Sequence, residues 1–361
     1  MSAIVTSPAY KKHLHLPTYI TAIGDTLYIT DSGNNRICKL NPDTSASTVA
    51  GGFPHGYKNA IGYKAKFNFP AGITAIGTTL FVADNHCIRK ITPDGAVTTF
   101  AGSPKRIGNK DGSGNEASFE HPEGIVAIRD VLYVADMLNR RIRKITPDGV
   151  VTTFAGFEWG YDDGVGIAAK FTLPTGIAAI GDTLYVTDGH RIRKITPGGV
   201  VTTLAGSEQG NQDGFGAEAK LNYPCGITAI GDTLYVSDTD NNRICKITSD
   251  GAVTTIAGSE KGNADGIGKY ASFYLPKGLV ALGNTLYVAD QLNHRIRKID
   301  LLPTPTNEDR ARKKNLHEEL TYHYPMGIFP GGIEFQLAQN NWHRMKSRKH
   351  LKKGRTTRKR K

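Results

Sequence analysis

The chain has 361 residues, among them 41 glycines and 17 prolines, a composition that favours many short strands joined by many turns. It contains no apolar stretch close to the roughly 18 residues that a membrane span needs, and its first 17 residues lack the long apolar core of a secretory signal. The sequence therefore predicts a monomeric intracellular protein, cytoplasmic or nuclear, that is neither secreted nor attached to a membrane.

The formal net charge of +12 is distributed very unevenly along the chain. Residues 1–300 contain 30 Lys and Arg against 28 Asp and Glu, whereas residues 301–361 contain 15 against 5. A nearly neutral body is thus followed by a basic end. Because electrostatic binding of nucleic acid needs a concentration of positive charge, the end of the chain is the expected place for it.

The body is a repeat. A proline opens each of six similar units, at steps of 50 to 53 residues: Pro17, Pro70, Pro122, Pro174, Pro224 and Pro276. Each unit divides into four short runs rich in Val, Ile, Thr and Tyr, as β-strands prefer. In the unit 174–223 these runs are 176–180, 183–187, 191–195 and 200–204, and Gly, Asp and Pro residues stand between them.

A unit of about 52 residues is too small to cover both faces of its own sheet, so the units must pack on one another. Radial packing into a ring covers the faces and protects most sheet edges. The sequence therefore predicts an all-β fold, a six-bladed β-propeller of four-stranded antiparallel blades, over residues 1–300.

The sequence motifs of the repeat resemble those of the NHL family of β-propellers. The elements that carry the resemblance are Leu-Tyr-Val-Ala-Asp, Asn-x-Arg-Ile-Arg-Lys-Ile, Val-Thr-Thr-x-Ala-Gly and Asp-Gly-x-Gly-x-x-Ala-x-Phe-x-x-Pro, which recur across residues 17–299. The resemblance implies the propeller fold. It implies little about activity, because one fold hosts many functions.

Blade six has three clear strands and needs a fourth to close the ring. Residues 3–6 resemble the fourth strand of other units, and residues 330–338 resemble both that strand and the turn before it. We favour 330–338 as the closing strand, with 3–6 as the alternative. Residues 301–329 then form an insertion or linker, and 339–361 form a disordered basic tail.

Two sets of charged residues recur at fixed places in the repeat and are predicted to be structural, as turn hydrogen bonds or charge pairs between blades. Aspartates end the second strand and arginines begin the third: Asp31, Asp84, Asp136, Asp188, Asp238 and Asp290; Arg36, Arg141, Arg191, Arg243 and Arg295. An Asp-Gly pair recurs in the long loop at 111, 163, 213 and 265, where we expect turn chemistry rather than metal binding.

Three histidines, His86, His190 and His294, lie at steps of 104 residues in blades two, four and six. Three imidazoles around an axis are the ligand set of a catalytic zinc. The loop that carries them is expected too far from the axis for one ion to reach all three, so we predict no metal and no cofactor. The amidating lyases that the repeat resembles place zinc histidines just before the blade-opening motif, where this chain has a single histidine, His13.

The four cysteines, Cys38, Cys87, Cys225 and Cys245, have no Cys-x-x-Cys spacing and are expected to be free thiols. No nucleophile elbow, P-loop or His-Glu-x-x-His motif is present in the sequence. We therefore predict a non-catalytic protein. The alternatives are a metal-dependent enzyme working in the channel, lyase-like or lactonase-like, and an RNA-binding propeller.

The last 18 residues carry eleven basic side chains and no acidic one: Arg344, Lys346, Arg348, Lys349, Lys352, Lys353, Arg355, Arg358, Lys359, Arg360 and Lys361. Such a run binds nucleic acid with little sequence preference, or serves as a nuclear-import address for a receptor. The sequence thus predicts a scaffold that binds a protein through one propeller face, with a basic tail for nucleic acid or another acidic partner.

Overall fold

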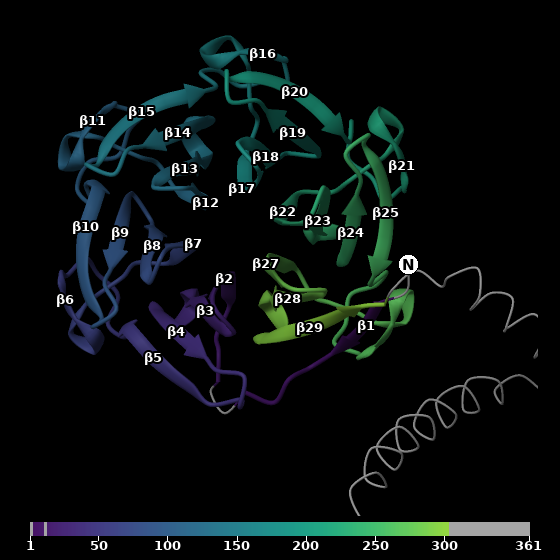
Figure 1. Ribbon diagram of the computed structural model, residues 1–361, viewed down its shortest axis with the longest axis horizontal. Coiled ribbons are helices and arrows are strands. Elements are labelled where there is room, and N and C mark those ends of the chain that lie inside the picture. The colour runs from purple at the N-terminus through teal and green to yellow at the C-terminus, as the bar shows by residue number, and fades with distance from the viewer. Residues whose placement is uncertain (1–2, 11–12, 303–361) are drawn as a thin grey trace, which may run out of the picture. The chain divides into compact units, whose positions relative to one another are not determined.

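The computed structural model describes residues 3–10 and 13–302, and it confirms the all-β ring of six blades (Figure 1). Each blade is one antiparallel sheet, and the chain passes around the ring one blade at a time. Within the described residues, no helix is long and apolar enough to cross a membrane.

The four main strands of each blade follow one another from the axis outward. The innermost are β2 (Pro17–Ile23), β7 (Pro70–Ile76), β12 (Pro122–Ile128), β17 (Pro174–Ile180), β22 (Pro224–Ile230) and β27 (Pro276–Leu282). The second are β3 (Thr26–Asp31), β8 (Thr79–Asp84), β13 (Val131–Asp136), β18 (Thr183–Asp188), β23 (Thr233–Asp238) and β28 (Thr285–Asp290). The third are β4 (Arg36–Leu40), β9 (Cys87–Ile91), β14 (Arg141–Ile145), β19 (Arg191–Ile195), β24 (Arg243–Ile247) and β29 (Arg295–Leu301). The fourth are β5 (Ala46–Gly51), β10 (Ala96–Gly102), β15 (Val150–Ala155), β20 (Val200–Ala205) and β25 (Ala252–Ala257).

The loops contain elements that the sequence analysis did not predict. A two-residue strand pairs with the outer edge of the blade that it precedes, so that five of the six described sheets have five strands: β6 (Ala60–Ile61), β11 (Gly112–Ser113), β16 (Gly164–Val165), β21 (Gly214–Phe215) and β26 (Gly266–Ile267). A 3-10 turn follows each: η2 (Gly62–Lys64), η3 (Gly114–Glu116), η5 (Gly166–Ala168), η6 (Gly216–Glu218) and η8 (Gly268–Tyr270). Four more 3-10 turns join the second and third strands: η1 (Ser32–Asn34), η4 (Met137–Asn139), η7 (Thr239–Asn241) and η9 (Gln291–Asn293).

The ring closes through the N-terminal strand, which corrects our preference for 330–338. Strand β1 (Ala3–Thr6) pairs antiparallel with β29, with Val5 opposite Ile299, and on its other edge with β26. Figure 1 shows this purple strand beside the yellow-green β29. Ala3 and Val5 are buried, and Ser7 donates two hydrogen bonds to Asp265. The strand thus brings its own apolar face and its own anchor, while 330–338 lies outside the described residues.

The hydrophobic core lies between blades rather than within them. One cluster, for example, joins Ala135 and Ile142 of blade three to Phe171 and Leu184 of blade four. The inner strands approach so closely that a side chain on Gly176 would meet the carbonyl oxygen of Cys225 at 1.9 Å. Each blade therefore buries its apolar side chains against the neighbouring blades, as the small size of the repeat unit predicts.

Candidate functional site on the loop face

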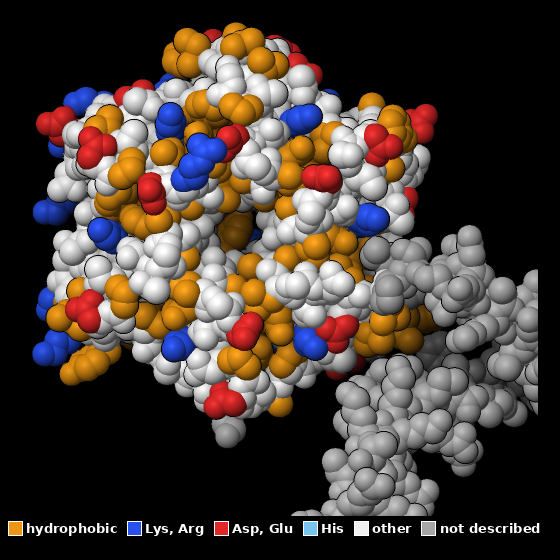
Figure 2. Space-filling view, viewed as in Figure 1, with side chains coloured by type: hydrophobic (Ala, Val, Ile, Leu, Met, Phe, Trp, Pro, Cys, Tyr) orange, Lys and Arg blue, Asp and Glu red, His pale blue; other side chains and the backbone are white. Residues whose placement is uncertain are grey.

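The two ends of the ring are built from different connections. At one end, here called the loop face, the second strand turns into the third and the long loop leaves the fourth strand for the next blade. The tight turns between strands one and two, and between strands three and four, lie at the other end. Figure 2 looks along the ring axis at one end, where apolar side chains alternate with charged ones around a central hollow.

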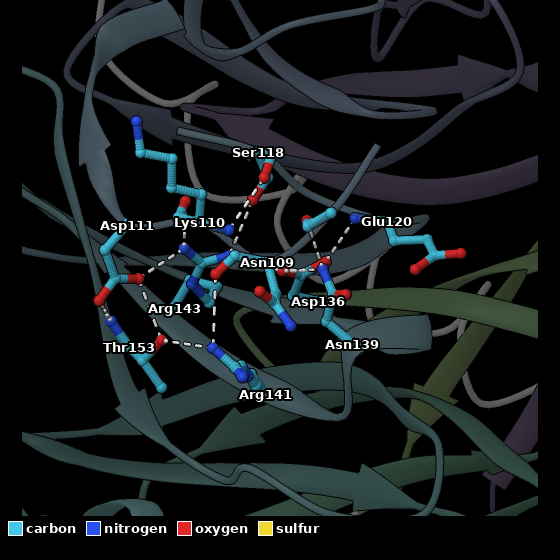
Figure 3. A network of polar contacts seen from close by, with 11 residues as sticks. Asn109, Lys110, Asp111, Ser118, Glu120, Asp136, Asn139, Arg141, Arg143 and Thr153 are labelled. Carbon is cyan, nitrogen blue, oxygen red and sulfur yellow. Dashed lines mark hydrogen bonds and ion pairs between the residues drawn. The ribbon is translucent and has the colours of Figure 1, made fainter. Parts of the chain in front are cut away.

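A buried arginine organises each long loop, as blade three shows (Figure 3). The fully buried Arg143 donates to Asp136 at 2.8 Å and to Asp111 at 2.7 Å. It also donates to the carbonyl oxygens of Ser118 and Lys110, at 2.9 and 3.0 Å. One guanidinium group therefore joins the end of β13 to two separate parts of the loop that enters the blade.

The two aspartates of this network also bind the backbone. Asp136 accepts the N–H of Glu120 at 2.8 Å, and Asp111 accepts the N–H of Thr153 at 3.0 Å. Burial raises the pKa of Asp136 above its ordinary value, and the Arg143 guanidinium opposes that rise. Asp111 has a lowered pKa, to which the Thr153 N–H and Arg143 both contribute. The network holds the loop in place.

Four blades use the same arrangement. The buried arginine pairs with the aspartate that ends the second strand in Arg89–Asp84, Arg143–Asp136, Arg193–Asp188 and Arg297–Asp290, at 2.8 to 3.1 Å. All six of the predicted aspartates are fully buried. The Asp-Gly aspartates do more than shape a turn, because Asp111, Asp163, Asp213 and Asp265 each pair with a buried arginine.

The predicted arginines contact the recurring aspartates in two blades and make other contacts in three. Arg36 and Arg243 pair with Asp31 and Asp238, at 2.6 and 2.7 Å. Arg141, Arg191 and Arg295 instead donate to loop carbonyl oxygens at 3.1 to 3.4 Å, because the arginine two residues later takes the aspartate. Blades one and five have a cysteine at that later position, Cys38 and Cys245, and there the first arginine turns inward.

The three histidines hold neighbouring blades together and do not meet one another. His190 accepts the backbone N–H of Tyr223 in the next blade at 3.4 Å, and His294 accepts that of Leu16 at 3.2 Å. His86 packs edge-on against His121, with ring centroids 5.0 Å apart. Within the described residues there is no group of three His, Cys, Asp or Glu side chains that could hold a metal ion.

Asparagine makes the same contact in two other blades. Asn35 and Asn242 accept the N–H of Phe69 and Leu275, each at 2.9 Å. In these four blades the position supplies a hydrogen-bond acceptor to the next blade. In blade two Nδ1 of His86 has no hydrogen-bond partner among the described residues, and in blade three Arg140 stands at this position. Burial lowers the pKa of His86 and His190 and so favours the neutral imidazole.

One set of exposed apolar side chains lies in three neighbouring long loops, while others, such as Phe215 and Tyr270, lie in the loops that enter blades five and six. The long loops that enter blades two, three and four, with the residue that precedes β7, carry Phe53, Phe69, Ile107, Phe157 and Trp159, which are 55% to 67% exposed. We call these five residues the aromatic sector. The loops that enter blades five and six have Gln209 and Lys261 where Trp159 stands. The sector was not predicted from the sequence, although a position-by-position comparison of the repeat units reveals it.

The six sheets around one axis define a six-bladed β-propeller. No protein-family model matches the chain. The human NHL repeat-containing protein 2 is 30% identical over 200 residues, which are 46% of this chain and 27% of that protein. The match thus spans about a quarter of that relative. Together with the repeated motifs and the six blades, this similarity supports an NHL-repeat β-propeller.

Two solved structures share the fold. An auxiliary nutrient binding protein from Bacteroides thetaiotaomicron has a TM-score of 0.63 and 14% identity, with 82% of this chain and 76% of that chain covered. Virginiamycin B lyase from Staphylococcus aureus has a TM-score of 0.54 and 17% identity, with 83% of this chain and all of that chain covered. At these identities the likeness concerns the fold alone.

Proposed function

We propose that the chain is a binding scaffold whose loop face holds a protein partner through the aromatic sector. The asymmetry of the ring carries this proposal. The Asp–Arg networks recur around the ring, as a structural role requires, whereas the position of the exposed Trp159 is occupied by Gln209 and Lys261 in blades five and six. Exposed Trp, Phe and Tyr are the side chains that most often dominate protein–protein binding.

The surroundings of the sector support a rigid binding surface. Arg141 lies over the ring of Phe157 at 4.8 Å, and Arg191 over that of Tyr161 at 3.7 Å. Lys170 pairs with Glu158 and Asp162 of the same loop, at 3.5 and 3.2 Å. These contacts hold the loop before any partner arrives, so that binding loses little loop entropy.

Site-specific photo-crosslinking tests the proposal. A photoreactive phenylalanine analogue placed at Trp159 should give a discrete crosslinked product in an extract of the source cells. The same analogue at Gln209, the equivalent position in blade five, is the matched control and should give none. Identical products at both positions, or none at Trp159, would refute a partner on the sector.

The crosslinked protein is then purified and its affinity for the chain is measured. We expect Trp159→Ala to weaken binding by at least about tenfold, because a central aromatic anchor contributes about 2 kcal/mol or more. Gln209→Ala should leave the affinity unchanged. Equal affinities for the two variants would show that the crosslink reports proximity and not recognition.

The basic tail is the second part of this proposal. Its eleven Lys and Arg residues, Arg344 to Lys361, lie outside the described residues, so the prediction for them rests on the sequence. We propose that they attach the scaffold to nucleic acid through phosphate contacts that weaken with salt. Failure of this part leaves the aromatic sector untouched, because the two use different residues.

A further inference from the structure

A separate group of polar side chains surrounds the axis of the ring. The second residue of each inner strand lies at the loop-face end of the channel; in chain order these residues are Thr18, Ala71, Glu123, Thr175, Cys225 and Lys277. The glycine that follows in five of the six strands packs on the backbone of the next strand, as Gly72 does on Glu123. The strands therefore converge here, and these side chains stand close to the axis.

Two of these residues carry opposite charges from opposite sides of the ring. Glu123 belongs to blade three and Lys277 to blade six. The Oε2 atom of Glu123 is buried and has no hydrogen-bond partner among the described residues. The Glu123 carboxylate also raises the pKa of Lys277, so the two charges interact across the channel although they do not form an ion pair.

Other polar groups share the same space. In blade one Tyr19 replaces the glycine of the other inner strands, and burial raises the pKa of its phenol well above the ordinary value. Cys225 is partly exposed, and burial raises the pKa of its thiol while the nearby Lys277 opposes that rise. A buried carboxylate oxygen without a hydrogen-bond donor is costly, and the Oε2 atom of the half-buried Glu123 is therefore a place that a ligand donor could satisfy.

We propose that the channel binds a small zwitterion, with the ammonium group of the ligand at Glu123 and its carboxylate at Lys277. Each contact would be a charge-assisted hydrogen bond in a confined, poorly solvated space, where such bonds are strongest. A singly charged molecule would satisfy one side and leave the other unpaired. The site involves no residue of the aromatic sector, so it goes beyond the scaffold function.

Linear amino acids of increasing length serve as molecular rulers for the span between the two charges. Isothermal titration calorimetry with the full chain would compare glycine, β-alanine, 4-aminobutyrate and 6-aminohexanoate with ethylamine and acetate. We expect one length to bind at least about tenfold more tightly than either singly charged probe. Equal binding of zwitterions and singly charged probes, or no binding by any of them, overturns the proposal.

Variants locate the site. Glu123→Gln and Lys277→Gln should each weaken the best probe by about tenfold or more, whereas the exposed controls Glu116→Gln and Lys64→Gln should not change its affinity. The double substitution Glu123→Lys with Lys277→Glu should restore binding, because the zwitterion can then bind in the opposite orientation. Unchanged binding in the single variants overturns the assignment.

The partly exposed Cys225 provides a test that needs no substitution. The other three cysteines are buried, so iodoacetamide should alkylate Cys225 first under native conditions. We expect the saturating best probe to slow this alkylation several-fold, as followed by mass spectrometry. An unchanged alkylation rate at saturation would show that the probe binds elsewhere, and so overturns the proposal even if a variant fails to fold.

Discussion

Replacing Arg143 by methionine should reveal the network on which the loop face is built. The change removes the hydrogen bonds to Asp111, to Asp136 and to two loop carbonyl oxygens, and it leaves Asp136 buried without its counter-charge. Breaking a buried pair in this way costs about 3–5 kcal/mol. We therefore expect Arg143→Met to lower the free energy of unfolding by that amount in urea titrations followed by circular dichroism.

The neighbouring Arg141 is the matched control. It lies on the same strand but makes longer bonds, at 3.3 and 3.4 Å, to Thr153 and to a loop carbonyl oxygen. We expect Arg141→Met to cost about 1 kcal/mol. In blade five the same position should behave differently, because Arg243 contacts both Asp213 and Asp238 and its loss should cost as much as that of Arg143.

The comparison of these three variants has one outcome that refutes the reasoning. If Arg141→Met destabilises the protein as much as Arg143→Met does, position in the repeat matters and the buried contacts do not. A further check is the double variant Arg143→Met with Asp136→Asn. Since it removes the unpaired charge, it should recover at least about 1 kcal/mol relative to Arg143→Met.

Three further predictions concern the blade contacts, the closure and the tail. Burial lowers the folded-state pKa of His190, so the unfolded state binds more protons than the folded state below about pH 6.5. The wild type should therefore lose stability relative to His190→Asn as the pH falls from 7.5 to 5.5. A difference in urea midpoints that stays constant over this range would contradict the hydrogen bond from Tyr223 to His190. In thermal denaturation, Val5→Asp should lower the free energy of unfolding by about 3 kcal/mol or more, because Val5 is buried. Thr6→Ala, on the exposed side of β1, should have little effect. Equal effects of the two substitutions would argue against closure of the ring by β1. Deleting residues 341–361 should leave the melting temperature unchanged but abolish salt-sensitive binding to a nucleic-acid oligomer in a fluorescence titration, and binding by the truncated chain would place that site on the propeller.

Much of the fold could be predicted because the signals are local and are repeated six times. Pro174 lies directly opposite Asp188 in the register, and both recur in every unit, so each blade provides evidence for the others. Alternating β-branched residues and Gly turns gave the boundaries of β17 to β20 to within about two residues. The two-residue fifth strands were not predicted from the sequence, because a segment of two residues shows no periodicity.

The candidate site was predicted less well because its residues depend on contacts between units. Choosing between Arg141 and Arg143 requires knowing which side chain reaches Asp136, and both lie on one face of the strand. The histidines suggested a metal site by their spacing alone, and the acceptor role of His190 and His294 became visible only with the N–H groups of the next blade in place.

By itself the sequence determined the number of blades, their strands and the separation of a neutral body from a basic end, because periodicity, turn residues and charge are properties of the chain alone. The tertiary structure decided how the ring closes, which arginine is buried and which charges meet at the axis. Ala3–Thr6 and 330–338 had similar local patterns, and only the tertiary structure showed which segment lies on the free edge of β29. Glu123 and Lys277 are more than 150 residues apart in the chain, and the closed ring alone brings them to opposite sides of one channel.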